Sequence, residues 1–277
     1  MTEYRGDYIL KNNDLLNSKS VNFDWLKSQP SVYEVIRLIN GVPLFIEKHA
    51  ERMRKSAMLI NLSLNPEIAS FENNIRKLAQ ANNIQEGNLK IVFPLSPENT
   101  CGDVFYYFIP HQYPTASMYA EGVLVSTLKA ERSNPNAKIS GLTVRTLADQ
   151  MIASKKVYEV LLVNDRGMVT EGSRSNFFFV KDNELFTSPE NTVLQGITRN
   201  MVISLCKDNN IPIHEREIPL SDLHSFSATF ITGTSPKILP VKAVDDLGFN
   251  PSNPLILKIM KFYDELINNY ITDKSRF

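Results

Sequence analysis

The sequence predicts an α/β protein with two domains. Its 277 residues exceed the usual length of a single domain. Hydrophobic residues make up 43% of the chain and charged residues 22%, a composition that can bury a large core. Short apolar runs rich in β-branched and aromatic residues alternate with amphipathic stretches. We expect a first α/β domain over 1–112, a linker over 113–122 and a second α/β domain over 123–277.

The first half contains a hairpin signal and two helical patterns. Asn40-Gly41 separates two apolar runs, and both residues tolerate the positive φ that a tight hairpin needs. The stretch PHQYPTASMYAEG, with two prolines and several small residues, has the composition of a linker. The expected elements are strands at 32–39 and 42–46, a helix carrying Ala50, Met53, Ala57 and Ile60 on one face, a helix starting at Pro66, and strands at 89–93 and 104–109.

The second half repeats this alternation of strands and helices. The segment GMVTEGSRSNFFFV stands out, because three phenylalanines typical of a buried strand follow a polar cluster with a glutamate and an arginine. Asp182-Asn183 is expected to turn this strand into a further hairpin. The expected elements are strands near 123–128 and 157–164, a helix at 142–154, a helix from 197, a strand and turn within 228–241, and a closing helix at 254–271.

Charge and cysteine content narrow the class of protein. Thirty basic residues face thirty acidic ones, so no net field favours nucleic acid or an anionic membrane surface. Cys101 and Cys206 form no CxxC pair, and the start of the chain lacks a signal-peptide pattern, so we expect a cytoplasmic protein. No apolar run reaches membrane length. The four histidines show no His-x-x-x-His pairing, so no metal site is expected.

Two loops have the properties of an anion site. Gly196-Ile197-Thr198 lies at a predicted helix start, where backbone N–H groups and the helix dipole favour a phosphate. Thr232-Gly233-Thr234-Ser235 offers successive N–H groups and hydroxyls in a turn. Each pattern alone is more often an ordinary helix cap or strand end. Lys138 and Glu171 could serve carbonyl or imine chemistry, but such a lysine is usually a solvated surface residue and such a glutamate is more often a strand-end carboxylate. These residues alone do not decide the function.

Five segments, taken in order, resemble the class IV aminotransferases, fold-type IV enzymes that use pyridoxal 5'-phosphate. The resemblance implies two α/β domains with the cofactor in the cleft between them, and a homodimer. It runs from about Val32 to Val241. The matching segments are VYEVIRLINGVPLFIEKHAERMRKSA, NAKISGLTVRTLADQ, VTEGSRSNFFFV, VLQGITRNMV and TFITGTSPKILPV.

The resemblance gives roles to the candidate residues. Lys138 matches the lysine that binds the cofactor covalently and then moves the substrate's α-proton, a task that suits an amine whose pKa shifts readily. Glu171 matches the carboxylate that keeps the pyridine nitrogen protonated. Arg52 matches an arginine that contacts the phosphate. The remaining phosphate contacts implied by the resemblance are Gly196, Ile197, Thr198, Gly233 and Thr234.

The substrate side departs from the family pattern. Tyr33 matches an aromatic residue near cofactor and substrate, although a core tyrosine is an alternative. The strand that carries a carboxylate-binding arginine in D-amino acid aminotransferases reads LKIVFPLSPENTCGD, with no arginine. Arg174 lies where these enzymes commonly have a small residue, and it could bind the substrate carboxylate or face solvent. If it faces solvent, the carboxylate would rest on the turn that includes Ser235.

The expected function is amino transfer between an amino acid, branched-chain or otherwise apolar, and a 2-oxo acid. Two alternatives remain open at this point. A 4-amino-4-deoxychorismate lyase would use the same cofactor-binding residues to eliminate pyruvate. A catalytically idle relative would bind pyridoxal 5'-phosphate or a partner protein without turnover.

Overall fold

The computed structural model describes residues 4–62, 64, 67–95, 102–132, 135–138 and 142–275. The chain divides into two compact units. The first comprises 1–112, 137–140 and 267–277, and the second comprises 113–136 and 141–266. The division therefore differs from the expected one, because two short segments of the expected second domain belong with the first unit.

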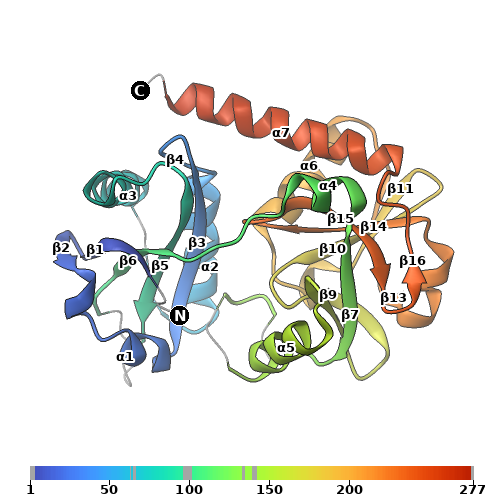
Figure 1. Cartoon of the computed structure of the whole chain (residues 1–277), viewed down its shortest axis with the longest axis horizontal. Coiled ribbons are helices and arrows are strands. Elements are labelled where there is room, and N and C mark those ends of the chain that lie inside the picture. Colours follow the sequence, from blue (N-terminus) through green and yellow to red (C-terminus); the bar gives the residue numbers. More distant parts are fainter. Residues whose placement is uncertain are drawn as a thin grey trace. The chain divides into compact units, whose positions relative to one another are not determined.

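The first unit is built on an antiparallel sheet covered by helices. Among its described residues, six strands lie in the order β2-β1-β6-β5-β3-β4, and every neighbouring pair is antiparallel. The strands are β1 (Arg5–Lys11), β2 (Asp14–Asn17), β3 (Ser31–Ile39), β4 (Val42–Pro43), β5 (Gly87–Pro94) and β6 (Phe105–Ile109). The helices are η1 (Ser18–Ser20), α1 (Phe23–Ser28), α2 (Ile46–Met58) and α3 (Ile68–Asn82). These elements form the blue and teal part of Figure 1.

The hairpin between β3 and β4 confirms the turn predicted from Asn40-Gly41. Both residues have positive φ, 52° and 75°, as a tight two-residue turn requires. The predicted second strand is too long, because Phe45 takes a φ of 53° and α2 begins directly after it. The strand therefore ends at Pro43, and the following residues turn the chain into the helix.

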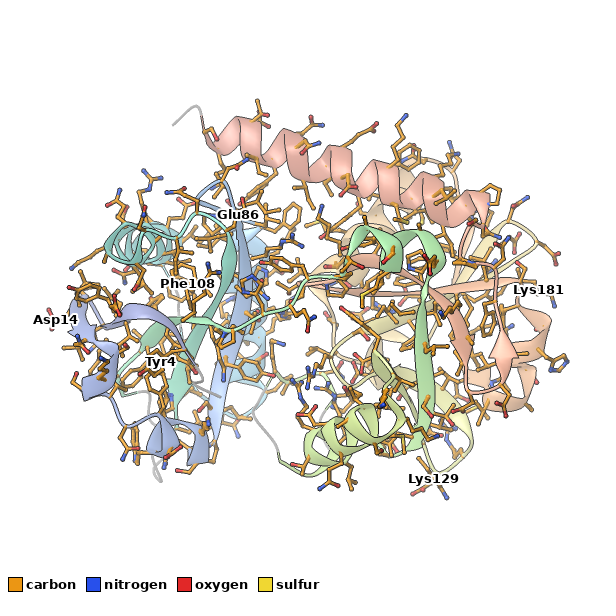
Figure 2. All side chains as sticks on the ribbon, viewed as in Figure 1. Tyr4, Asp14, Glu86, Phe108, Lys129 and Lys181 are labelled. Atoms are coloured by element: carbon orange, nitrogen blue, oxygen red, sulfur yellow. The ribbon has the colours of Figure 1, made fainter. Side chains whose placement is uncertain are left out.

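Helices α2 and α3 pack their apolar faces into one core with the sheet. Met53 and Ala57 of α2, and Ile75 and Leu78 of α3, are fully buried in it. Phe108 of β6 lies in the same cluster and is labelled in Figure 2. The amphipathic spacing thus predicted both helices, but Ile60, expected on the face of the first, lies in the turn after α2 ends at Met58. The expected start of the second helix at Pro66 lies outside the described residues.

The second unit holds a larger mixed sheet. Within the described part of the chain its strands follow the order β12-β11-β10-β14-β15-β7-β8-β9-β13, with β16 beside β15. Pairs β11–β12, β15–β7 and β7–β8 are parallel. The strands are β7 (Val123–Lys129), β8 (Glu159–Val163), β9 (Met168–Gly172), β10 (Asn176–Lys181), β11 (Glu184–Thr187), β12 (Ile213–Glu215), β13 (Ile218–Pro219), β14 (Ala228–Gly233), β15 (Lys237–Val244) and β16 (Leu247–Gly248). The helices are α4 (Ala116–Glu121), α5 (Leu142–Lys155), η2 (Glu190–Thr192), α6 (Ile197–Asp208) and η3 (Leu220–Ser225). Helix α7 (Pro254–Lys274) begins in the second unit, and its residues from Ile267 onward belong to the first.

Residues expected to form a linker are instead part of the second unit. Thr115 accepts a hydrogen bond from the N–H of Met118 and caps helix α4. Tyr119 of this helix donates a hydrogen bond to the carbonyl of Pro236. The small residues of this stretch therefore form a capped helix that is fastened to the larger sheet.

Strand β10 is buried on both faces, as its phenylalanine run predicts. Phe177 and Phe179 point into one apolar cluster. Phe178 points to the other face, where it stacks on Phe230 of β14 with ring centroids 5.1 Å apart. The strand is thus fixed from both sides, and it can position the polar residues that precede it.

None of the described helices combines the length and apolarity needed to span a membrane.

We predict that Phe178→Ala lowers the free energy of unfolding by about 3–5 kcal/mol, because it leaves a cavity and removes a stacked ring. Urea unfolding measures this change. Leu147→Ala is the control, since Leu147 is 46% exposed on α5 and its truncation should cost less than about 0.5 kcal/mol. Equal losses in the two variants would contradict the assignment of Phe178 to the core.

Candidate active site

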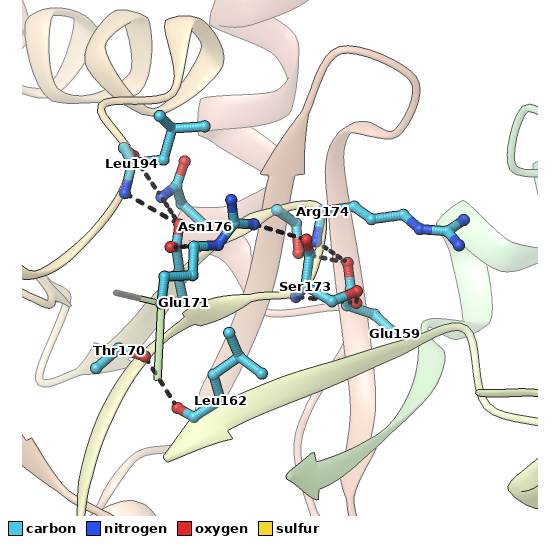
Figure 3. Close-up of polar contacts among 10 residues, drawn as sticks. Glu159, Leu162, Thr170, Glu171, Ser173, Arg174, Asn176 and Leu194 are labelled. Atoms are coloured by element: carbon cyan, nitrogen blue, oxygen red, sulfur yellow. Dashed lines mark hydrogen bonds and ion pairs between the residues drawn. The ribbon is translucent and has the colours of Figure 1, made fainter. Parts of the chain in front are cut away.

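Glu171 is a buried carboxylate near the end of β9, and it is held on both oxygens. Its exposed fraction is 2%. Oε1 pairs with Nε of Arg132 at 3.0 Å. Oε2 accepts a hydrogen bond from the N–H of Leu194 at 3.1 Å and lies 3.5 Å from Nδ2 of Asn176. Figure 3 shows these contacts. A nearby cation and N–H donors favour the charged form of a buried carboxylate and fix its direction.

A second buried carboxylate, Glu159 of β8, organises the turn that follows Glu171. It accepts hydrogen bonds from the N–H and hydroxyl of Ser173, the N–H of Arg174 and the hydroxyl of Ser175. The carbonyl of Ser173 in turn accepts a hydrogen bond of 2.7 Å from Arg132. Glu159 therefore holds the turn, and the turn helps to hold the arginine that pairs with Glu171.

The side chain of Arg174 leaves this network. It is half-exposed and forms an ion pair with Asp149 of α5. Figure 3 shows it directed away from Glu171. The two sequence-based alternatives were a substrate contact and a solvent-facing residue, and this geometry favours the second.

Helix α6 begins beside the Glu171 network. Gly196 precedes the helix, which has no side-chain cap. A Cβ on Gly196 would lie 2.1 Å from Oδ1 of Asn176, so only glycine allows this approach. Asn176 also donates a hydrogen bond to the carbonyl of Leu194. The helix start with Ile197 and Thr198, both buried, is therefore fastened next to Glu171 and has the anion-binding character of a helix N-terminus.

The end of strand β14 meets the same asparagine. Thr232 pairs with Asn176 in the register between β10 and β14. Its hydroxyl is buried and has no hydrogen-bond partner among the described residues, so it suits a polar ligand atom. Gly233 ends the strand, and Thr234 and Ser235 follow in the turn. The second unit thus brings the carboxylate and both predicted phosphate loops together around Asn176.

Lys138 lies in the first unit, where its main chain is fastened on two sides. Its N–H donates to the hydroxyl of Ser56 at 3.1 Å, and its carbonyl accepts from the N–H of Tyr33 at 3.3 Å. Its Nζ lies 4.7 Å from the centre of the Tyr33 ring. The backbone of one edge of β3 and a hydroxyl of α2 therefore fix the lysine, and two predicted site residues come into contact.

Two other lysines of the chain, Lys129 and Lys155, have surface positions. Lys129 is 73% exposed at the end of β7 and faces Asp165. It projects outward in Figure 2. Lys155 is half-exposed and bonds the hydroxyl of Ser126. Lys138 has the more enclosed environment, which is what a reactive amine requires.

Arg52 forms part of a buried ionic cluster on α2. Its Nε and Nη2 donate to the carboxylate of Glu34 at 2.7 and 2.5 Å, and Nδ1 of His49 lies 2.7 Å from the same carboxylate. Burial opposes ionisation of Glu34, but the Arg52 guanidinium and the His49 ring hold its pKa at about 2. Burial lowers the pKa of His49, although Glu34 acts in the opposite direction. Because Nδ1 of His49 faces a carboxylate oxygen, it is the hydrogen-bond donor in this contact.

Sequence reasoning missed the residues that support the predicted ones. Helical spacing offered one signal, because His49, Arg52 and Ser56 recur on one face of α2. Strand alternation offered another, since Tyr33 and Glu34 must point to opposite faces of β3. Pairings between distant segments gave no local signal. The missed residues are Glu34, His49, Ser56, Arg132, Glu159 and Asn176.

Comparisons with known proteins identify the family of this chain. The family described as amino-transferase class IV matches residues 31–244. A probable branched-chain-amino-acid aminotransferase of Thermotoga maritima is 32% identical over 87% of this chain and 88% of its own length. A D-alanine aminotransferase of Bacillus licheniformis is 30% identical over 81% of this chain and 83% of its own length.

A solved structure shows the same fold. The branched-chain aminotransferase of the thermophilic archaeon Thermoproteus uzoniensis, crystallised with norvaline, aligns with a TM-score of 0.83. The alignment covers 96% of this chain and 96% of that one at 24% identity. The chain therefore belongs to the class IV aminotransferases, a family of enzymes that depend on pyridoxal 5'-phosphate.

We predict that the ionic cluster of Glu34, Arg52 and His49 makes the folded protein less stable in acid. Because its pKa is about 2 in the folded protein against an ordinary value of 4.5, ionised Glu34 stabilises the fold above about pH 4.5. This contribution, about 3 kcal/mol, is lost as the pH falls towards 2. Urea unfolding between pH 2 and pH 7 should show this slope in the wild type and a shallower one in Glu34→Gln. Glu51→Gln, at an exposed position of α2, is the control, and slopes as shallow in wild type as in Glu34→Gln would contradict the prediction.

Proposed function

We propose that this enzyme transfers an amino group from an amino acid to a 2-oxo acid with pyridoxal 5'-phosphate as cofactor. The observation that carries the proposal is the ionised Glu171, held by Arg132 and Leu194 beside the start of α6. The site combines a fixed buried carboxylate with a helix N-terminus, which favours anionic groups. It suits a ligand with a protonated ring nitrogen at one end and a phosphate at the other.

The residues of the second unit fit this ligand chemically. Glu171 would accept the hydrogen bond of the pyridine N–H and keep that nitrogen charged. The N–H groups of Ile197 and Thr198, with those of Gly233 and Thr234, would donate to the phosphate oxygens. The buried Thr232 hydroxyl is a further donor. When bound, the cofactor supplies the electron sink that stabilises negative charge on the substrate's α-carbon.

The residues of the first unit would supply the amine and a further cation. We propose that Lys138 bonds the cofactor and moves the α-proton, because its main chain is fixed and its Nζ lies against the Tyr33 ring. Arg52 is a guanidinium that Glu34 holds in one orientation, and such a group suits a phosphate oxygen. The expected homodimer and cytoplasmic location stay predictions.

Substrate identity is the finer part of the proposal. We favour branched-chain or other apolar amino acids, supported by the Thermotoga maritima relative. D-Alanine is the competing substrate, supported by the Bacillus licheniformis relative. The two relatives have similar identity to this chain, so only an assay separates these substrates.

We predict amino transfer in a panel of L- and D-amino acids with 2-oxoglutarate, followed by the oxo acid formed. L-Leucine should be a better donor than D-alanine. Glu171→Gln should bind the cofactor yet react slower by two to three orders of magnitude, because the ring nitrogen loses its anion. Pyruvate release from aminodeoxychorismate without amino transfer would identify a lyase instead. Cofactor binding with no turnover of any compound would indicate an idle relative.

We predict that borohydride reduction of the cofactor-loaded protein labels Lys138. Mass spectrometry of the digested protein should find the pyridoxyl group on the peptide that contains this residue. Lys138→Ala should take up no label, while Lys129→Ala, at an exposed position, should be labelled like the wild type. A label on Lys129, Lys155 or Lys156 would overturn the assignment.

A further inference from the structure

We propose that Lys90 binds a carboxylate of the substrate and so determines which amine donors the enzyme accepts. The proposal rests on the proposed function, because it names the chemical group that this function must recognise. It concerns a residue of β5 that no sequence pattern singled out.

The pairing of three strands places Lys90 on the same face of the sheet as Tyr33. In the register, Lys90 lies between Val35 of β3 and Tyr107 of β6. Since side chains alternate along a strand, Tyr33 and Val35 share the face of Lys90. The opposite face of these strands packs into the core with α2 and α3. Lys90 therefore stands on the face that carries Tyr33.

Two amines lie against the same tyrosine ring. Nζ of Lys90 is 5.1 Å from the centre of the Tyr33 ring, and Nζ of Lys138 is 4.7 Å from it. Lys90 is also 5.9 Å from the centre of the Tyr107 ring. The two amines can be no farther apart than the sum of their distances to Tyr33. Lys90 therefore lies within about 10 Å of the amine that we propose acts on the α-carbon, so a substrate bound at Lys138 would extend close to Lys90.

The charges on this face favour an anion. Strands β3, β5 and β6 contain one carboxylate, Glu34, and it points to the opposite face, where it binds Arg52. Arg37 of β3 lies on the face of Lys90, paired in register with Asn88. These strands thus present two cations and no carboxylate to it. Lys90 is half-buried among aromatic rings, where an ammonium group attracts a carboxylate more strongly than in water.

By this proposal Lys90, rather than Arg174, binds the substrate carboxylate. Arg174 forms its ion pair with Asp149 on the surface of the second unit. The strand sequence LKIVFP carries no arginine, but its lysine is a cation at a position that faces Tyr33. The substrate carboxylate thus has a candidate partner in the same unit as Lys138.

The test compares Lys90→Met and Lys90→Arg with wild-type holoenzyme. Lys11→Met is the matched control, because Lys11 also lies over an aromatic ring of this sheet but pairs with Asp103. Steady-state kinetics would use leucine, glutamate and 1-phenylethylamine, which carry one, two and no carboxylates. Calorimetry would measure binding of glutarate, an unreactive dicarboxylate, so that one readout does not depend on turnover.

We expect Lys90→Met to raise the Michaelis constant of amino acids and weaken glutarate binding, each by about tenfold or more. The amine lacking a carboxylate should be unaffected, and Lys90→Arg should recover most of the loss. A loss for both amino acids assigns Lys90 to the α-carboxylate, whereas a loss for glutamate alone assigns it to the side-chain carboxylate.

The proposal would be overturned if Lys90→Met binds amino acids and glutarate like the wild type, or if it loses the simple amine equally. Its failure is distinguishable from failure of the proposed function. An enzyme that transfers no amino group, but binds glutarate through Lys90, would refute the function alone. Amino transfer that ignores Lys90 would refute this inference alone.

Discussion

The ion pair between Glu171 and Arg132 is the interaction on which the second unit's polar site depends. A carboxylate that is 2% exposed is stable only when a cation and hydrogen-bond donors replace the water it has lost. Arg132 supplies the charge, and the N–H of Leu194 brings the start of α6 to the same carboxylate. The neighbouring strand β10, buried on both faces, gives this network a rigid support.

The first unit also contains a buried carboxylate, which a different set of residues stabilises. Glu34 has no exposure, and it obtains two hydrogen bonds from Arg52 and one from His49. Arg52 supplies the positive charge that balances the Glu34 carboxylate. Replacing only one partner of such a pair leaves the other charge buried, which commonly costs about 3–5 kcal/mol. A single substitution that removes one partner of either buried carboxylate would therefore carry this cost.

Local sequence patterns predicted helices and strands, but not the residues that position the candidate site residues. Turn chemistry identified the hairpin at Asn40-Gly41, and the phenylalanine run identified a strand buried on both faces. The patterns failed where the backbone leaves its preferred regions, as at Phe45, which takes a positive φ and ends β4 early. They also failed for the linker, because a threonine cap turned small residues into helix α4.

The candidate residues were found as single positions, while their partners came from distant segments. Glu159 and Arg132 act on the segment around Glu171 from elsewhere in the sequence, and no periodicity connects them. Lys90 was overlooked for a related reason. Its role follows from the register of three strands, and the sequence of one strand shows only that a lysine interrupts an apolar run.

Hydrogen bonds to its main chain hold Lys138 in place, whereas its side chain would carry out the chemistry. Ser56 and Tyr33 bind its N–H and carbonyl, so the segment is held whatever side chain residue 138 carries. An alanine there would remove the amine and leave the backbone in place. Such a protein would be a suitable trap for capturing substrates in solution or in crystals, because it could bind them without being able to consume them.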